Sequence, residues 1–261
     1  MQMNDEISKV VDWLKINKLS LNLKKTQFMI FKKCRSKIVL SNDIVVDNVK
    51  IEKVLHTKFL GVLIDQHLTF EAHVKYIKGK ISRGIGILFK ARKYLNKASL
   101  LTIYHAFINP YFMYCVTIWG NTYQYVLDPL SKLQKRTVRL VMGAGKYDHT
   151  YPIFQNLKIL NLRNVYIYYV LIFLYKYHQQ ILPDIFIDFF TLNNAIHDHK
   201  TRQKDNFHTQ LARCFQMSRA LRTYGVGIYN YFSNLIDFNC SFVTFKYEAK
   251  KYILSHDLSH L

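Results

Sequence analysis

The hydrophobic pattern of the chain changes its period near Thr69. Before this residue, the apolar run Phe28 to Phe31 and the extended piece Ile44 to Ile51 are typical of strands. After it, apolar residues recur at the spacing of one helix face: Val74, Ile77, Ile81, Ile85 and Leu88. The order of the two patterns predicts an α+β fold, with a small antiparallel sheet at the N-terminus followed by a mostly helical region.

The stretch from His56 to Asp65 lies at the junction of the two regions. Its compact apolar run, Phe59 to Ile64, is rich in residues that favour strands, and it predicts one buried strand. Gly61 within such a run indicates that another backbone approaches closely. We expect this strand to connect the sheet to the helices.

Turn and cap residues delimit the other N-terminal elements. Asn4 or Asp5 can cap a first helix that ends near Asn17. A further strand is expected from Lys37 to Leu40, followed by a turn at Ser41 to Asp43.

Four later helices are expected, from about Lys97 to Asn109, Tyr125 to Gly143, Leu162 to His178 and Phe242 to Leu254. The first has Asn96 as its cap and four side chains that should point inward: Leu101, Tyr104, Phe107 and Ile108. The third is almost wholly apolar and should be central to the core. Gly225-Val-Gly227 predicts a break in the chain.

The charge of the chain is strongly one-sided. It has 37 Lys and Arg against 17 Asp and Glu, a net charge of +20. Between Ala72 and Tyr147 there are thirteen basic residues and a single acid, Asp128. Like charges repel along a helix, so this concentration costs stability unless a partner supplies the counter-charge. A phosphate backbone is the partner that such a surface fits, and its recognition would depend on shape and charge rather than on base sequence.

The candidate binding residues lie on two helices. They are Lys75, Lys78, Lys80 and Arg83 on the first, and Lys132, Lys135, Arg136 and Arg139, which share one face, on the second. Two alternatives remain open: an exposed basic face without a ligand, and a helix from Leu127 to Met142 lying on anionic lipid. That helix lacks exposed Trp or Phe anchors, and the longest apolar run, Val165 to Tyr175, is too short to cross a bilayer, so no membrane partner is expected.

Metal and acid-base chemistry find little support in the sequence. The carboxylates of the β-region, Asp43, Asp47, Glu52 and Asp65, form no pair that could bind two metal ions, and the first two are expected in turns. A zinc set of His197, His199, His208 and Cys214 matches no standard spacing. We therefore expect no catalytic residue, no metal ligand and no cofactor in this chain.

The spacing of the cysteines indicates in which cellular compartment the protein is expected. Cys34, Cys115, Cys214 and Cys240 form no close pair, which argues against a disulfide framework. The N-terminus lacks the basic-then-apolar order of a signal peptide. These features predict an intracellular protein, nuclear or cytoplasmic, that is not secreted.

Four segments follow one another in an order found in a known polymerase family. They are Trp13-Leu-Lys-Ile-Asn-Lys-Leu-Ser-Leu-Asn-Leu-Lys-Lys-Thr26, Lys58-Phe-Leu-Gly-Val-Leu-Ile-Asp65 with Leu68 and His73, Leu133-Gln-Lys-Arg136, and Ile196-His197 with Thr201-Arg202. Together they resemble the C-terminal part of reverse transcriptases from non-LTR retrotransposons of the LINE type, jockey-like elements in particular. The chain departs from the family at His199, where tyrosine is frequent.

The resemblance implies roles for parts of the chain. Residues 1–70 would be a remnant of the palm, in which Lys25 lies near the triphosphate of the incoming nucleotide. Phe59, Leu60 and Gly61 would form the primer grip. Residues 71–182 would be a basic, helical, thumb-like region that closes on RNA or an RNA/DNA duplex, and residues 183–261 a C-terminal helical region.

The same resemblance shows what the sequence lacks. The family binds Mg²⁺ through carboxylates of upstream palm motifs, including a Tyr-x-Asp-Asp hairpin, and no such motif occurs here; Met1 lies just after its expected position. We expect a fragment of an RNA-directed DNA polymerase that cannot polymerise alone. Whether it associates with a separate chain that carries the catalytic half is left open. The alternatives are a non-enzymatic basic nucleic-acid-binding module and a degenerate remnant that does not fold stably.

Overall fold

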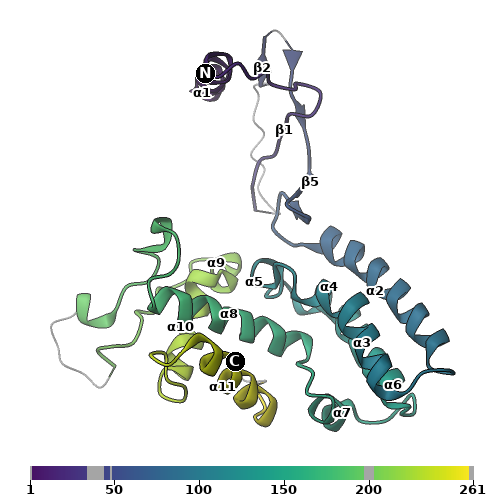
Figure 1. Cartoon of the computed structure of the whole chain (residues 1–261). Coiled ribbons are helices and arrows are strands. Elements are labelled where there is room, and N and C mark those ends of the chain that lie inside the picture. Colours follow the sequence, from purple (N-terminus) through teal and green to yellow (C-terminus); the bar gives the residue numbers. More distant parts are fainter. Residues whose placement is uncertain (1, 34–43, 48, 197–202, 259–261) are drawn as a thin grey trace. The chain divides into compact units, whose positions relative to one another are not determined.

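The computed structural model describes residues 2–33, 44–47, 49–196 and 203–258. The chain forms two compact units, Met1–His73 and Val74–Leu261 (Figure 1). Helices predominate and the named strands all lie in the first unit, so the α+β prediction is confirmed. The expected strand at Lys37 to Leu40, the turn at Ser41 to Asp43, Cys34 and most of the Ile196 to Arg202 motif lie outside the described residues.

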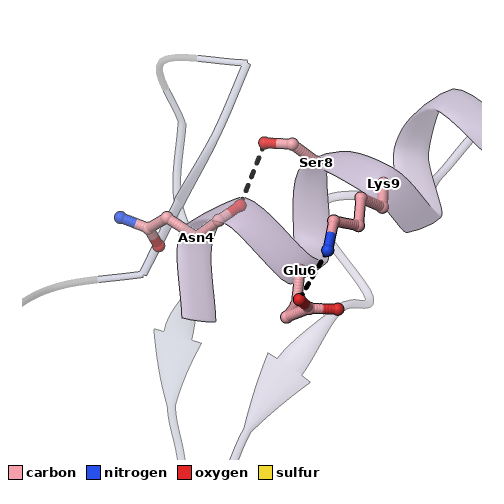
Figure 2. A network of polar contacts seen from close by, with 4 residues as sticks. All are labelled: Asn4, Glu6, Ser8 and Lys9. Carbon is pink, nitrogen blue, oxygen red and sulfur yellow. Dashed lines mark hydrogen bonds and ion pairs between the residues drawn. The ribbon is translucent and has the colours of Figure 1, made fainter. Parts of the chain in front are cut away.

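Helix α1 (Gln2–Ile16) begins earlier than expected. Asn4 therefore lies in its first turn and does not cap it: the Asn4 carbonyl accepts a hydrogen bond from Ser8 Oγ at 2.9 Å, beside a Lys9–Glu6 ion pair of 2.7 Å (Figure 2). The Asn4 side chain instead lies 3.5 Å from the backbone nitrogen of Val45. The caps predicted at Asn4 or Asp5 were wrong because the helix begins at Gln2, so both residues lie within it.

The strands of the first unit form three separate pairs among the described residues, rather than one small sheet. β1 (Gln27–Phe28) pairs in parallel with β4 (Glu52–Lys53). β2 (Val45–Val46) and β3 (Val49–Lys50) pair antiparallel, with Asp47 at a φ of 48° between them, which confirms the turn expected at Asp47. A small core holds the unit together, made of Val11, Ile44, Val46 and Ile51 with Ile7, Leu21, Leu23 and Phe28 packed against it.

The stretch from His56 to Asp65 is a β-hairpin and not the single buried strand that its composition predicts. β5 (His56–Phe59) pairs antiparallel with β6 (Val62–Asp65), and Phe59 lies opposite Val62. Leu60 and Gly61 form the turn with φ of 44° and 87°, the positive values that two-residue hairpins require. Only Val62 of the ten residues is buried, so the apolar run reflects a turn with an exposed tip rather than a core strand.

Asp65 organises the loop that leads into the first long helix. Its Oδ1 accepts hydrogen bonds from the backbone nitrogens of His67 and Thr69 at 3.0 and 3.1 Å. Its Oδ2 accepts from Thr69 Oγ1 at 3.1 Å and from the backbone nitrogen of Phe70 at 2.6 Å. These bonds hold a loop in which Leu68 and Phe70 both have positive φ, so the carboxylate of Asp65 has a structural role.

The helices that follow are α2 (Glu71–Ala91), α3 (Lys97–Phe107), α4 (Asn109–Met113), α5 (Val116–Trp119), α6 (Gln124–Met142), α7 (Thr150–Asn156), α8 (Leu162–His178), α9 (Phe215–Arg219), α10 (Leu221–Phe232) and α11 (Phe242–Ser255), with 3-10 turns η1 (Asp184–Phe186) and η2 (Asn193–Ala195). Helix α8 contacts α4, α5, α6, α10 and α11 and lies among them in Figure 1. Its side chains Ile167, Val170, Leu171 and Leu174 are fully buried. The prediction that this apolar helix is central is confirmed.

Two expected helix ends in the second unit are confirmed. Asn96 Oδ1 accepts a hydrogen bond from the backbone nitrogen of Ser99 at 2.9 Å at the start of α3. Gly143 ends α6 with a φ of 70°. Phe107, however, is 52% exposed although it was expected to point inward. Helix α3 ends at this residue, and Ile108, whose φ of −122° is no longer helical, is fully buried as expected.

The expected break at Gly225-Val-Gly227 is absent, because both glycines lie inside α10. Gly225 is buried, and a Cβ added there would lie 3.6 Å from Phe190. Such an atom would make an ordinary van der Waals contact with this ring, which belongs to an aromatic cluster with Phe207 and Tyr229. Among the described residues, nothing lies within 4 Å of a Cβ added at Gly227, so neither glycine is required by a turn or by a close contact.

Candidate nucleic-acid interface

Helix α2 separates apolar from basic side chains as predicted. The five apolar residues of its stripe, from Val74 to Leu88, are all at most 4% exposed. Lys75, Lys78 and Arg83 are exposed, whereas Lys80 is half-buried, with its Nζ 5.5 Å from the centroid of the Tyr76 ring. Burial of the stripe fixes the rotation of the helix about its axis, and this places the cations outside the core.

A glycine sets how closely α2 packs on α3. A Cβ added at Gly84 would lie 2.8 Å from Ile108 Cγ1 and 3.1 Å from the Phe107 carbonyl oxygen, which is too close for a real side chain. Gly79 and Gly86 on the same helix have nothing within 4 Å of such an atom. Only Gly84 is therefore required by its surroundings.

Helix α6 carries the second set of cations. Lys132, Lys135 and Arg136 are exposed, and Arg139 is half-buried. The Nε of Arg139 donates a hydrogen bond to the backbone carbonyl of Asp148 at 2.9 Å. The other side of the helix is buried through Val126, Leu130, Val138 and Val141. The structure thus places all four predicted cations on the side of α6 that faces away from the core.

Two buried polar residues on α6 were not predicted. Gln134, 1% exposed, donates from Nε2 to the Leu160 carbonyl at 3.0 Å and to the Tyr104 hydroxyl at 3.4 Å. Burial raises the pKa of Tyr104 to about 12. Thr137 donates to the Leu133 carbonyl at 2.8 Å. The Thr137 bond lies within α6, whereas the two Gln134 bonds attach the inner side of α6 to α3 and to the segment before α8.

Two further cations join the α6 residues in space. Arg92 follows α2 and Lys146 follows α6, and both line a hollow together with Arg136 and Arg139. Neither belongs to a periodic pattern, so the sequence offers no signal that would bring them together. Among the residues that the structure describes, none of these four cations, nor any of the predicted ones on α2 and α6, forms an ion pair with a carboxylate.

The residues expected near the polymerase site lie in the first unit. Lys25 is exposed in a turn, and its backbone nitrogen donates a hydrogen bond to the Asn22 carbonyl at 3.0 Å. Phe59 and Leu60 are 62% and 73% exposed at the tip of the β5–β6 hairpin, with Gly61 beside them. The primer-grip and nucleotide-binding roles of these residues stay predictions.

The described part of the chain has no group of three or more His, Cys, Asp or Glu side chains arranged to bind a metal ion. His197 and His199 lie outside it, and His208 Nδ1 is 3.2 Å from Asn193 Oδ1. No helix in residues 2–33, 44–47, 49–196 and 203–258 combines the length and the hydropathy needed to cross a bilayer.

Known proteins resemble part of this chain. A segment of 117 residues, 44% of the chain, is 26% identical to the probable RNA-directed DNA polymerase from transposon X-element of Drosophila melanogaster. Segments covering 40% and 39% of the chain are each 29% identical to the RNA-directed DNA polymerases from mobile element jockey of Drosophila melanogaster and Drosophila funebris.

The similarity is confined to a small part of those proteins, 13% of the first and 12% of the other two. No protein-family model matches the chain. No solved structure matches it either. Over about two fifths of its length, the chain is similar to the reverse transcriptases of jockey-like and X-element retrotransposons, as its motifs indicated.

Proposed function

We propose that this chain binds the sugar-phosphate backbone of RNA or of an RNA/DNA duplex through the basic sides of α2 and α6. The observation that carries the proposal is the set of eight cations on these helices, six of them exposed, with no carboxylate paired to any of them among the described residues. A solvated helix surface normally mixes both signs of charge, because like charges on neighbouring turns repel. Phosphates of a bound strand would supply the missing counter-charge.

The role of a thumb fits this surface. The relatives are named RNA-directed DNA polymerases, and proteins of that kind hold a template-primer while they copy it. We infer that residues of α2 and α6 contact the backbone of the duplex, and that the exposed hairpin tip at Phe59 and Leu60 is the primer grip. Lys25 would then lie toward the incoming nucleotide.

The second part of the proposal is that the chain does not polymerise DNA by itself. Its sequence holds no Tyr-x-Asp-Asp motif, and the two-metal chemistry of nucleotide transfer needs converging carboxylates. Purified protein supplied with Mg²⁺, primer-template and deoxynucleotides should incorporate none. Measurable incorporation would contradict this part and leave the binding claim intact.

The binding claim is tested by replacing Lys132, Lys135, Arg136 and Arg139 together with alanine. Affinity for a labelled RNA/DNA hybrid is measured by fluorescence anisotropy between low and moderate salt. Each lost phosphate contact lowers the slope of log affinity against log salt by roughly 0.7 to 0.9, so the slope should fall by about 2 to 4. An unchanged slope would show that this side of α6 is not the contact surface.

A charge-matched control removes the effect of net charge. Lys15, Lys18, Lys33 and Lys53 of the first unit are exposed and lie outside the proposed interface, so their joint replacement with alanine removes the same four charges. This variant should keep most of the salt slope. A cooperative melt of both variants by circular dichroism shows that they fold, and absence of a cooperative melt in the unaltered chain would favour the degenerate-remnant alternative.

A further inference from the structure

A hollow of about 570 Å³ lies where α2 and α6 end, and its wall is mostly basic. Arg92 and Phe89 line it from the end of α2, Arg136 and Arg139 from α6, and Lys146 from the loop that follows. Among the residues that the structure describes, no acidic side chain lines it. Four cations from three segments of the chain therefore converge on one concave site, which differs from the open sides of the helices.

Cations at the ends of helices have an ordinary explanation, because they offset the negative end of the helix dipole. Each helix end carries about half a negative charge, so the two ends amount to about one charge against four cations. The last carbonyls of α6 also have backbone donors: Ala144 N lies 2.9 Å from the Arg139 carbonyl oxygen, and Gly143 N lies 3.4 Å from that of Leu140. Compensation of the dipoles accounts for only a minor part of the positive charge.

Two of the cations are held in place by neighbouring groups. The Arg92 guanidinium lies 4.3 Å from the centroid of the Phe89 ring. Arg139 Nε bonds to the Asp148 carbonyl, and the Asp148 carboxylate accepts a hydrogen bond from the backbone nitrogen of Gly145 at 2.7 Å, which closes the loop that carries Lys146. Guanidinium groups fixed in this way are suited to bidentate binding of a phosphate.

We propose that this hollow binds the terminal phosphate of a nucleic-acid strand, and the proposal rests on the function proposed above. A phosphate within a strand is a singly charged diester that continues on both sides, and it fits an open helix side. A terminal phosphate is a monoester with a charge near −2 at neutral pH, and it can enter a concave site with several cations. The shared chemistry of a 5′ and a 3′ end is the phosphate monoester.

The test compares three internally labelled RNA strands of one sequence: with a 5′-phosphate, with a 3′-phosphate and with hydroxyls at both ends. The unaltered protein should bind at least one phosphorylated form about tenfold more tightly than the hydroxyl form, the effect of one charge-assisted contact. The joint change Arg92→Ala and Lys146→Ala should remove this preference. The form that is preferred tells which end enters.

Lys90→Ala with Lys93→Ala is the matched control, because both side chains are exposed at the same end of α2 and neither lines the hollow. This variant loses the same two charges and should keep the preference. Equal loss in both variants would overturn the proposal, since the preference would then reflect the general field. Equal binding of all three strands with a normal salt slope would overturn the hollow alone, and no binding of any strand would overturn the proposed function with it.

Discussion

Arg139 donates a hydrogen bond from Nε to the backbone carbonyl of Asp148 over 2.9 Å, so the end of the basic side of α6 is attached to the loop that follows it. The bond orients the guanidinium relative to the helix. No side-chain hydrogen bond of this kind holds Arg136, one turn earlier, within the described residues. The two arginines therefore differ in how firmly the side chain is held, although they carry equal charge.

This difference predicts unequal effects of a charge-preserving change. Arg139→Lys should weaken binding of an RNA/DNA hybrid by about 1 kcal/mol, because lysine cannot make the Nε bond. Arg136→Lys should have a smaller effect. The salt slope should stay the same in both variants, since the charge is conserved. Equal affinities of the two variants in anisotropy titrations would show that the bond to Asp148 has no part in binding.

The hairpin tip predicts opposite effects at neighbouring positions. Leu60 has a positive φ that leucine tolerates poorly, so Leu60→Asn should stabilise the first unit by about 0.5 to 1 kcal/mol. Gly61→Ala should destabilise it by about 1 kcal/mol, because alanine is strained at a φ of 87°.

Urea unfolding measures both changes, and Leu55→Asn is the control because Leu55 is exposed without a positive φ. A gain at Leu55 equal to that at Leu60 would contradict the turn geometry. If Leu60→Asn stabilises the fold but weakens hybrid binding, leucine is retained at the tip for contact, as a primer grip requires.

Three glycines of α2 make a matched series. Gly79→Ala and Gly86→Ala should each stabilise the protein by about 0.5 to 1 kcal/mol, since alanine favours helices and nothing lies within 4 Å. Gly84→Ala should destabilise it, because its Cβ would lie 2.8 Å from Ile108 Cγ1. Thermal melts compare the three variants, and a stable Gly84→Ala protein would mean that α2 does not pack on α3 this closely.

Replacing the buried Gln134 of α6 should lower the free energy of unfolding considerably. Gln134→Ala leaves the Leu160 carbonyl without its donor and opens a cavity, so unfolding should become easier by about 2 to 4 kcal/mol. Gln155→Ala is the control, because its bond to the Leu254 carbonyl, 3.3 Å long, is exposed. A similar cost for the two changes would contradict the buried network.

The sequence predicted the helices better than the strands. In α2 and α6 a long apolar stripe determines both the type of element and its rotation, whereas the nearly unbroken apolar run of α8 indicates only that the helix is buried. The β5–β6 hairpin was missed because its first turn residue is Leu60, which no turn preference indicates. Whether a short apolar run forms one strand or a hairpin depends on the backbone φ of its two central residues. Composition alone does not give these angles.

The candidate interface was predicted in part for a related reason. Lysines and arginines that share one helix can be placed on a common side from their spacing, as for Lys132 and Arg136. Arg92 and Lys146 reach the hollow only through the way α2 and α6 end, which depends on tertiary packing. The buried partners of Gln134 were hidden too, because a polar residue between basic ones is expected to be solvated.

His73 predicts how stability depends on pH. It is 2% exposed, its Nδ1 accepts a hydrogen bond from the Leu63 backbone nitrogen at 3.4 Å, and burial lowers its pKa from 6.5 to about 4. The imidazole is therefore neutral in the folded chain at pH 5, whereas in the unfolded chain it takes up a proton below pH 6.5. Its contribution to stability is present above pH 6.5 and is lost as the pH falls toward 4.

The loss between pH 7 and pH 5 should be about 2 kcal/mol in urea unfolding, beyond the changes due to other groups. His73→Asn keeps an acceptor for Leu63 without a titrating ring, so it should flatten the pH dependence by this amount. His149→Asn, at an exposed histidine, is the matched control for the loss of an imidazole. If the free energy of unfolding of His73→Asn still falls steeply between pH 7 and pH 5, another group causes the loss. The buried imidazole beside the β5–β6 hairpin would then not be the source of the pH dependence.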